Sequence, residues 1–353
     1  MDRAVDTGAP GRAVPRGPAP PPTRAAGSGP ERRSRPPRPR WTAVVAVGCL
    51  APWGAWAVVR LLGLEAGFLP VALMAFTPYV AATACVPLAL ALLARRWSAA
   101  LAAGAVAAAL ACCVLPRALP GPQPQPAPTG PRLTVMTVNM YYGLADPEAL
   151  VRLVREYGVD VLSLQELTPQ SADALSRAGL RAALPHEVAY AASGPVGGAV
   201  YSSYPLTDRG RPPTEHFAMP RAEVEVAGAP PVEVVAAHPM PPVGSSAMEE
   251  WTASLRELPD ATPDGALRIL AGDFNATHDH AEFRALLESG YTDAAAATGD
   301  GWHPTWPSDG SLPGTVLDHV LVDRRAAVEH TDVHTIPGSD HRAVVATLTL
   351  PAA

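Results

Sequence analysis

The sequence predicts a layered α/β or α+β domain that follows a group of three apolar helices. Two observations predict this division. Residues 41–115 are almost continuously apolar, whereas residues 132–353 alternate short apolar runs typical of strands with a few amphipathic helices. The length of 353 residues is enough for about two domains.

The first 40 residues form a tail rich in Arg and Pro. They contain nine Arg and three acidic residues among many Pro and Gly, and few apolar side chains. Such a segment cannot bury enough apolar surface to offset the entropy of ordering. We therefore expect residues 1–40 to be disordered.

Three apolar runs follow, at residues 41–62, 68–93 and 97–115. Each has roughly the 17 to 25 residues that a helix needs to span a bilayer. The alternatives are a buried helical hairpin or a signal peptide, but a signal peptide has a single apolar run of roughly 7 to 15 residues. We therefore expect three transmembrane helices, with Arg60 extending its side chain to the lipid headgroups.

The cations predict the orientation of these helices. The nine Arg of the tail and the Arg95–Arg96 pair both belong on the cytoplasmic side under the positive-inside rule, and two crossings separate them. Three crossings place everything after Leu115 outside the cytoplasm, in a multi-pass protein of the cell membrane that has the lipid bilayer as a partner. If the Ala-rich third run did not insert, the C-terminal domain would be cytoplasmic. No protein partner is predicted.

A Pro-rich segment, residues 116–131, is predicted to be an extended linker to the C-terminal domain. The domain at residues 132–353 has 14 Arg against 29 Asp plus Glu, a net charge of −15, so it lacks the basic character of a non-specific nucleic-acid binder. It contains no Cys, which excludes disulfides and Cys-ligated metals. Helices are predicted at residues 147–157 and 281–289, and strands at residues 133–139, 159–164, 198–202, 221–226, 232–237, 268–271, 317–322 and 343–350.

Polar residues stand where many of these strands end. They are Asn139, Glu166, His238, Asp273 with Asn275, Asp318 with His319, and the run Ser339–Asp340–His341. Any one of them alone is explained as a turn or surface residue. Because strand ends of a layered sheet lie together at one rim, the whole set is predicted to converge.

These side chains share one chemistry. Oxygen ligands without Cys suit a hard cation, Mg²⁺ or in its place Mn²⁺, that is bound by one or two carboxylates and a substrate phosphate. A His beside a carboxylate, an activated water and a cation are what in-line hydrolysis of a phosphoester requires. Asp273 and Asn275 are two residues apart, so on a strand both face the same side of a phosphate.

Seven short motifs in a fixed order then resemble the endonuclease/exonuclease/phosphatase superfamily of metal-dependent phosphoesterases. They are TVNMYYG, LSLQEL, AAHPM, LAGDFNAT, TWP, LDHVLVD and GSDHRAV, and they cover residues 132–350. The resemblance implies a DNase-I-like fold of the α/β (α+β) class. This is a four-layer sandwich of two packed, mainly antiparallel β-sheets flanked by helices.

The resemblance also implies roles for individual residues. Glu166 matches the acidic metal ligand, Asn139 matches the Asn that helps to hold the metal-bound water and the phosphate, and Asp340 matches a second acid near the metal. Arg221 resembles an Arg that often opens the preceding strand and is a candidate for substrate binding. Apart from the resemblance, Trp306 is a candidate for stacking on a base or entering a headgroup region, and the alternative for it is a packing role.

The remaining matches concern the reacting groups. Asp273 matches the residue that orients or deprotonates the attacking water, and Asn275 matches a phosphate contact. His341 matches the His at the phosphoryl group, and Asp318 matches its acidic partner. His238 stands where some members have Tyr, and its His form is similar to the sphingomyelinase, deadenylase and phosphoinositide-phosphatase branches.

The leading hypothesis is a membrane-anchored, divalent-metal-dependent phosphoesterase that hydrolyses phosphodiesters, with nucleic acid or phospholipid as substrate. The alternatives are a sphingomyelinase-like or phosphoinositide-phosphatase-like lipid phosphoesterase, a two-metal calcineurin-like enzyme, and a catalytically silent membrane binding module. The calcineurin-like fold requires a GNH[DE] motif, which is absent from the sequence. We interpret His278–Asp279–His280 as a polar loop rather than a metal site. The substrate, the mode of cleavage, the number of metals and the oligomeric state stay open.

Overall fold

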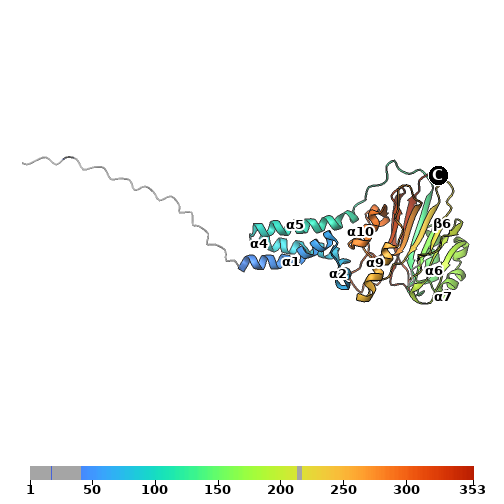
Figure 1. Ribbon diagram of the computed structural model, residues 1–353, viewed down its shortest axis with the longest axis horizontal. Coiled ribbons are helices and arrows are strands. Elements are labelled where there is room, and N and C mark those ends of the chain that lie inside the picture. The colour runs from blue at the N-terminus through green and yellow to red at the C-terminus, as the bar shows by residue number, and fades with distance from the viewer. Residues whose placement is uncertain (1–16, 18–40, 213–216) are drawn as a thin grey trace, which may run out of the picture. The chain divides into compact units, whose positions relative to one another are not determined.

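The computed structural model describes Gly17, residues 41–212 and residues 217–353, with only the backbone for residues 41–47 (Figure 1). Apart from Gly17, the predicted tail of residues 1–40 lies outside the described residues. Residues 43–353 form one compact unit.

Residues 132–353 contain two six-stranded sheets. The first has the strand order β11-β12-β1-β2-β4-β3, and the second has the order β5-β6-β7-β8-β10-β9. Strand β1 pairs in parallel with β2, and β7 with β8, while the other pairs are antiparallel. The two mainly antiparallel sheets expected from the resemblance are therefore confirmed. The strands are β1 Arg132–Asn139, β2 Val161–Gln165, β3 His186–Tyr190, β4 Gly198–Ser202, β5 Leu206–Asp208, β6 Arg221–Val224, β7 Val232–Ala237, β8 Leu267–Asp273, β9 Tyr291–Asp293, β10 Asp318–Asp323, β11 Ala327–Thr335 and β12 Arg342–Thr349.

Helices cover the outer faces of both sheets. The first sheet packs against α6, α7 and α8, and the second against α9 and α10, while a third apolar cluster fills the space between the sheets. Figure 1 shows α6 and α7 on one side of the sheets and α9 and α10 on the other. These helices are α6 Pro147–Glu156, α7 Pro169–Arg177, α8 Leu180–Ala183, α9 Met248–Arg256, α10 Ala281–Glu288 and the short α11 Ala294–Thr298.

The alternation of side chains along each strand determines what faces the space between the sheets. In β1, Leu133 and Val135 belong to the core between the sheets, whereas Met136 and Val138 pack against the outer helices. The same alternation holds in β7, β8 and β10. The inward positions turn polar at one end of these strands, and this end carries the candidate site.

The apolar region before the domain forms five helices, and its second run differs from the single helix expected at residues 68–93. The run is broken, and Phe68–Met74 and Thr77–Leu93 are bent by 66°. Pro78 explains the break, because it has no N–H to bond the carbonyl of Met74, and the Thr77 hydroxyl donates to that carbonyl instead. The helices are α1 Trp41–Leu62, α2 Phe68–Met74, α3 Thr77–Thr83, α4 Cys85–Leu93 and α5 Trp97–Val114, followed by the 3₁₀ turn Leu115–Ala118.

Within the described residues, fewer helices could cross a membrane than the three expected. One helix, Trp97–Ala118, is long and apolar enough, with a mean hydropathy of 2.2. The bent pair Phe68–Met74 and Thr77–Leu93 would be a second if it counts as one span. In the first run, Gly48–Leu62 is a shorter apolar helix.

A buried ion cluster joins the apolar helices to the sheet domain. The fully buried Asp279 carboxylate accepts hydrogen bonds from Arg60 at the end of α1 and from Arg117 just after α5, each at 2.7 Å. The expectation that Arg60 reaches lipid headgroups was therefore wrong, because its guanidinium is used by the domain. Removing one partner of a charge pair this deeply buried strongly destabilises the folded protein.

Candidate active site

The Asp273 carboxylate lies at the centre of the polar cluster. This last residue of β8 is 2% exposed. Its Oδ1 accepts the backbone N–H of Asn275 at 2.9 Å, and its Oδ2 accepts the Asn139 amide at 3.0 Å. The Nε2 atoms of His341 and His238 are 3.6 and 3.9 Å from the same Oδ2. The side chains of Asn139, His238 and His341 therefore meet at the Asp273 carboxylate. The expectation that Asn275 faces the same side as Asp273 on a strand was wrong, because β8 ends at Asp273, Asn275 has a left-handed φ, and its amide donates to the Pro239 carbonyl at 3.1 Å.

Strand geometry explains this convergence. Asn139, Asp273 and Asp318 continue the inward-facing positions of β1, β8 and β10, and the β8–β10 register pairs Asp273 with Asp318 directly. Gly272 permits the close packing of β8 on β7, because a Cβ at this position would collide with the carbonyl of Ala237. The site thus lies between the two sheets at one end.

His341 is held as a cation by carboxylates. Its Nδ1–H donates to Asp318 Oδ2 at 2.8 Å. Burial alone would lower the pKa of His341, but the nearby Asp318 and Asp273 carboxylates outweigh it and raise the pKa to about 10. The Thr305 hydroxyl accepts the backbone N–H of Asp318 and so fixes the start of β10. His341 can therefore stabilise negative charge on a substrate.

His238 has the opposite character. Burial lowers its pKa to about 4, the charge of His341 adds to this effect, and Asp273 opposes it. Its ring packs edge-on against Phe217, with centroids 4.6 Å apart. Its buried Nδ1 has no hydrogen-bond partner among the described residues. A neutral imidazole of this kind offers a hydrogen bond to a ligand without adding charge.

Glu166 lies on the other side of Asn139. Its Oε1 accepts the Asn139 amide at 3.2 Å, and its Oε2 accepts the backbone N–H of Tyr142 at 2.6 Å. Burial raises the pKa of Glu166, against the two hydrogen bonds that lower it, and Asp273 raises it further. A bound cation would offset this accumulation of negative charge.

Backbone strain is concentrated around the cluster. Among the described residues, five that are not Gly have a left-handed φ, and four of these adjoin the site: Tyr141, Tyr142, Glu166 and Asn275. Each costs roughly 1–3 kcal/mol and persists where the surroundings impose it, which is common at functional sites. These conformations point the Tyr142 N–H and the Glu166 side chain at each other. Sequence reasoning missed this backbone contribution, because only the unusual run YYG hinted at it.

Asp340 and Trp306 border the cluster. The Trp306 Nε1–H donates to Asp340 Oδ2 at 3.2 Å, and the Trp306 ring centroid is 6.5 Å from that of His341. Ser339, which the sequence offered without a role, donates from Oγ to the Asn139 carbonyl at 2.7 Å and accepts the His341 N–H. It therefore ties β1 to the segment that carries His341.

Arg221 does not join the other predicted site residues. Its Nε donates to Glu233 at 2.7 Å, and Arg268 binds the other oxygen of that carboxylate. Arg221 pairs with Val235, whose side chain packs on the outer, helix-covered face of the second sheet. The prediction that Arg221 contacts substrate is corrected to a structural ion pair on that sheet.

A second group of His and Asp residues, His278, Asp293 and His319, lies behind the site. His319 directly follows Asp318 on β10 and so faces the opposite side of the sheet. His278 Nε2 and His319 Nδ1 donate to Asp293 Oδ2 at 2.6 and 2.9 Å. His319 Nε2 donates to the Ala276 carbonyl, and Ala295 N–H donates to Asp293 Oδ1. We call this group the inner cluster.

The residues around Asp273 fit a hard divalent cation. Ligand atoms of Asp273, Asp318 and His341 all lie within 4.8 Å of one another, and because His341 is protonated only the carboxylates of this group can bind a cation. Asp318 Oδ1 and Asp340 Oδ1 are buried oxygen atoms without a hydrogen-bond partner among the described residues. In the inner cluster, no side-chain nitrogen or oxygen atom is both buried and without a partner. Unpartnered buried oxygens require a ligand, a cation or a water. The oxygen-rich donor set suits Mg²⁺ or Mn²⁺.

Comparison with known families agrees with this geometry. A sequence profile described as the Endonuclease/Exonuclease/phosphatase family matches residues 136–341, more than half of the chain. The chain belongs to the endonuclease/exonuclease/phosphatase family. It is therefore a metal-dependent phosphoester hydrolase.

Several solved structures are similar to the chain at low sequence identity. An endonuclease/exonuclease/phosphatase from Beutenbergia cavernae DSM 12333 is 20% identical, with a TM-score of 0.47, over 62% of this chain and 72% of that one. A humanized D. rerio TDP2 with 14 mutations is 20% identical, with a TM-score of 0.48, over 62% and 98%. A family protein from Leptotrichia buccalis C-1013-b is 16% identical, with a TM-score of 0.46, over 61% and 99%. No curated protein matches the sequence.

Proposed function

We propose that this endonuclease/exonuclease/phosphatase family member is a membrane-anchored, Mg²⁺-dependent phosphodiesterase whose catalytic domain lies outside the cytoplasm. The observation that carries the catalytic part is the meeting of Asn139, His238 and His341 at the Asp273 carboxylate. A carboxylate, a cationic His and a neutral His around one point can activate water and bind a phosphoryl group at the same time.

Asp273 accepts the proton of the attacking water. The water oxygen forms a bond to phosphorus as the bond from phosphorus to the leaving oxygen breaks, and the products are a phosphomonoester and an alcohol. The His341 imidazolium, held by Asp318, stabilises the charge that develops on the phosphoryl oxygens. The neutral His238, and the Asn275 amide N–H that is not bound to the Pro239 carbonyl, donate hydrogen bonds to the same group.

Glu166, hydrogen-bonded to Asn139, is the proposed holder of the cation, and Asp340 is proposed as a second acid near it. A divalent cation bound there supplies Lewis-acid stabilisation of the phosphate. The backbone N–H of Tyr142 and the Asn139 amide keep the Glu166 carboxylate in its position. Trp306 orients Asp340 through its indole N–H.

Exposed apolar side chains support the membrane anchor. Of the 22 exposed large apolar residues in the described part of the chain, 16 lie between Val58 and Leu119. Leu93 and Leu101 are 81% and 76% exposed. Apolar surface concentrated in this way marks an interaction site, and a lipid bilayer would cover helices of this composition.

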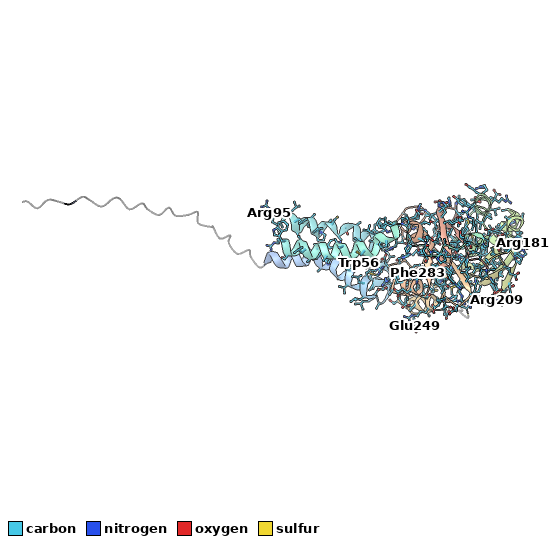
Figure 2. All side chains as sticks on the ribbon, turned by 90° about the horizontal axis from the view of Figure 1, so that it is seen from above. Trp56, Arg95, Arg181, Arg209, Glu249 and Phe283 are labelled. Atoms are coloured by element: carbon cyan, nitrogen blue, oxygen red, sulfur yellow. The ribbon has the colours of Figure 1, made fainter. Side chains whose placement is uncertain are left out.

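The ends of the helices support the proposed orientation. Arg60 and Arg117 bind Asp279 of the sheet domain, so the C-terminal ends of α1 and α5 lie at that domain. With 18 residues, α5 is about 27 Å long, which places Arg95 and Arg96 at the other end (Figure 2). The positive-inside rule then puts Arg95 and Arg96 in the cytoplasm and the sheet domain outside.

The test of the catalytic part is hydrolysis by the full chain in detergent, with Mg²⁺ or Mn²⁺. The substrates are single- and double-stranded DNA, RNA, phospholipids and a chromogenic phosphodiester. We expect Mg²⁺-dependent cleavage that Asp273→Ala abolishes and that Asp264→Ala, at an exposed position in the loop between α9 and β8, leaves unchanged. Full activity in Asp273→Ala would contradict the proposal, and binding without hydrolysis of any substrate would favour a silent binding module.

The test of the orientation is protease treatment of intact cells. Cleavage of the C-terminal domain from outside is the expected result. Protection until the cells are lysed would place the domain in the cytoplasm instead.

A further inference from the structure

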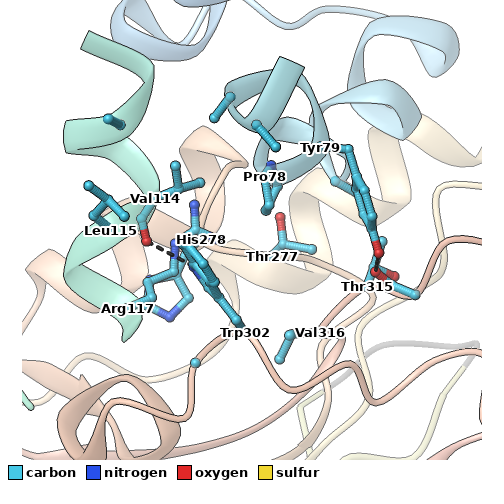
Figure 3. Close-up of a pocket in the computed structure, with 16 residues that line it drawn as sticks. Pro78, Tyr79, Val114, Leu115, Arg117, Thr277, His278, Trp302, Thr315 and Val316 are labelled. Atoms are coloured by element: carbon cyan, nitrogen blue, oxygen red, sulfur yellow. Dashed lines mark hydrogen bonds between the residues drawn. The ribbon is translucent and has the colours of Figure 1, made fainter. Parts of the chain in front are cut away.

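An apolar cavity lies between the apolar helices and the catalytic domain. Its volume is about 380 Å³, within the range of roughly 300–1,000 Å³ of small-molecule pockets. Figure 3 shows Pro78 and Tyr79 of α3 on one side and Trp302 and Val316 of the catalytic domain on the opposite side. Val114 at the end of α5 completes the wall. The cavity is therefore shared by the two parts of the molecule.

Most polar groups in this wall are paired, and the exception among the described residues is the buried Arg117 Nε. Arg117 binds Asp279, the Tyr79 hydroxyl donates to the Gly314 carbonyl, and the Trp302 indole N–H donates to the Val114 carbonyl (Figure 3). His278 Nε2–H donates to Asp293, and burial lowers the pKa of His278, so this ring is neutral. Because the wall is mainly apolar and its one charged side chain, Arg117, is paired with Asp279, the cavity suits a hydrocarbon chain rather than an anion.

Both segments that form the catalytic-domain side of the cavity continue into the active site. Thr277 and His278 follow Asn275 by two and three residues. The segment 302–316 carries Trp302 and Val316 in the cavity wall, and between them Trp306, which donates to Asp340. A molecule in the cavity would thus be held by the segments that hold the catalytic cluster.

The rim of the active site is also apolar. In residues 120–353 as described, the exposed large apolar side chains all lie on segments next to the cluster. They are Tyr141, Tyr142 and Leu144 after β1, Val243 after β7, and Trp302 and Leu312 on either side of Trp306. A domain with 14 Arg against 29 acidic residues has no net basic charge to attract a polynucleotide.

We infer that the substrate is an amphiphilic phosphoester, whose phosphate binds at Asp273 and His341 and whose hydrocarbon chain binds in the cavity between α3, α5 and the segment 302–316. This inference rests on the proposed function, because it assigns a substrate class to the same site. The apolar helices form one wall of the chain site, so in the anchored protein a lipid can enter it from the bilayer. The helices then contribute to substrate recognition as well as to anchoring.

The test compares two chromogenic substrates that differ only in chain length, 4-nitrophenyl methyl phosphate and 4-nitrophenyl dodecyl phosphate. The full chain is assayed in one detergent at one concentration. We expect kcat/KM to be about tenfold or more higher for the dodecyl ester, because burying each methylene group stabilises the complex. Ala111→Phe on α5 places a ring in the cavity and should bring this ratio close to one.

A matched control separates the cavity from effects of the detergent. Ala108→Phe adds the same ring to the same helix at an exposed position outside the cavity, and it should keep the wild-type ratio. Ala82→Phe on α3 fills the cavity from a second helix, so a folding defect in one variant does not decide the result. Thermal unfolding of each variant reports its fold.

Each remaining outcome has one meaning. Equal cleavage of both esters by the wild type, or a ratio that survives in both cavity variants, would overturn the inference and leave the phosphodiesterase proposal standing. Faster cleavage of single-stranded DNA or RNA than of either ester would do the same. Cleavage of none of these substrates would overturn the proposed function itself.

Discussion

Two clusters of His and Asp side chains lie on opposite faces of β10 and differ in what they leave unpaired. The site cluster, Asp273, Asp318 and His341, faces the space between the sheets, while the inner cluster, His278, Asp293 and His319, faces the outer helices. Either group could hold a metal by the distances between its ligand atoms.

The hydrogen bonds separate the two clusters. In the inner cluster, both Asp293 oxygens and both His319 nitrogens have partners. In and beside the site cluster, three buried atoms have no hydrogen-bond partner among the described residues: Asp318 Oδ1, Asp340 Oδ1 and His238 Nδ1. Residue types and spacing therefore do not distinguish these two clusters, whereas the unsatisfied buried polar atoms do. We assign chemistry to the site cluster and a structural role to the inner cluster.

The largest effect is expected from Asp273→Asn. The amide keeps the shape of the side chain and removes the base, so kcat should fall by about 10²–10⁴-fold. The unfolding temperature should stay within a few degrees of the wild type. Initial rates with a chromogenic phosphodiester and a thermal unfolding scan measure both quantities, and a loss of activity below tenfold would rule out Asp273 as the base.

Asp293→Asn should show the reverse pattern. It leaves a buried His319 without its counter-charge, which costs about 3–5 kcal/mol in the free energy of unfolding. The midpoint of thermal unfolding should fall, while kcat of the folded protein at low temperature stays within a few-fold of the wild type. An unchanged midpoint together with lost activity would move the inner cluster into the catalytic machinery.

A smaller effect is expected from Glu166→Gln. Without the carboxylate, the Mg²⁺ concentration for half-maximal activity should rise by about 10–100-fold, the usual cost of disturbing a metal site. Glu257→Gln, an exposed substitution of the same type, is the matched control and should not change it. A Mg²⁺ titration of the rate measures this, and identical curves for all three proteins would remove Glu166 from the cation site.

The smallest effect concerns the dependence of stability on pH. Burial lowers the pKa of His319, but the Asp293 carboxylate outweighs burial and the net shift is upward. The contribution of His319 to the free energy of unfolding is therefore present below about pH 6.5 and is lost as the pH rises through its folded pKa. Burial raises the pKa of Asp293, but His319 and His278 outweigh burial and the net shift is downward. The contribution of Asp293 to the free energy of unfolding is therefore present above about pH 3.9 and is lost as the pH falls through its folded pKa. The difference in unfolding midpoint between wild type and Asp293→Asn should therefore be largest between these limits. A difference that does not vary with pH would contradict the ionic description of the pair.

The sequence predicted much of this arrangement, because strand ends and motif order carry it. Asn139, Asp273 and Asp318 end or begin apolar strands, and period-two alternation alone places them on the same face as the core residues before or after them. The same rule places His319 on the opposite face from Asp318. Its partner Asp293 could not be predicted, because it depends on the β9–β10 register that pairs Leu321 with Asp293.

Other features depend on three-dimensional contacts that leave no local pattern. Arg60 was expected at lipid headgroups because its neighbours are apolar, yet it binds Asp279 more than 200 residues later. Arg221 opens its strand as expected, but the β6–β7 register directs its side chain to Glu233. The second apolar run was predicted as one helix from its length, and the break at Pro78 within it was not predicted.

The most direct test of the comparison is a crystal of the protein soaked in Mn²⁺ and measured for anomalous scattering. The predicted result is a peak beside the Glu166 carboxylate, within reach of Asn139 and Asp340, and no peak at the inner cluster. A peak between His278, Asp293 and His319, or none at Glu166 at saturating Mn²⁺, would contradict the assignment of the cation to Glu166.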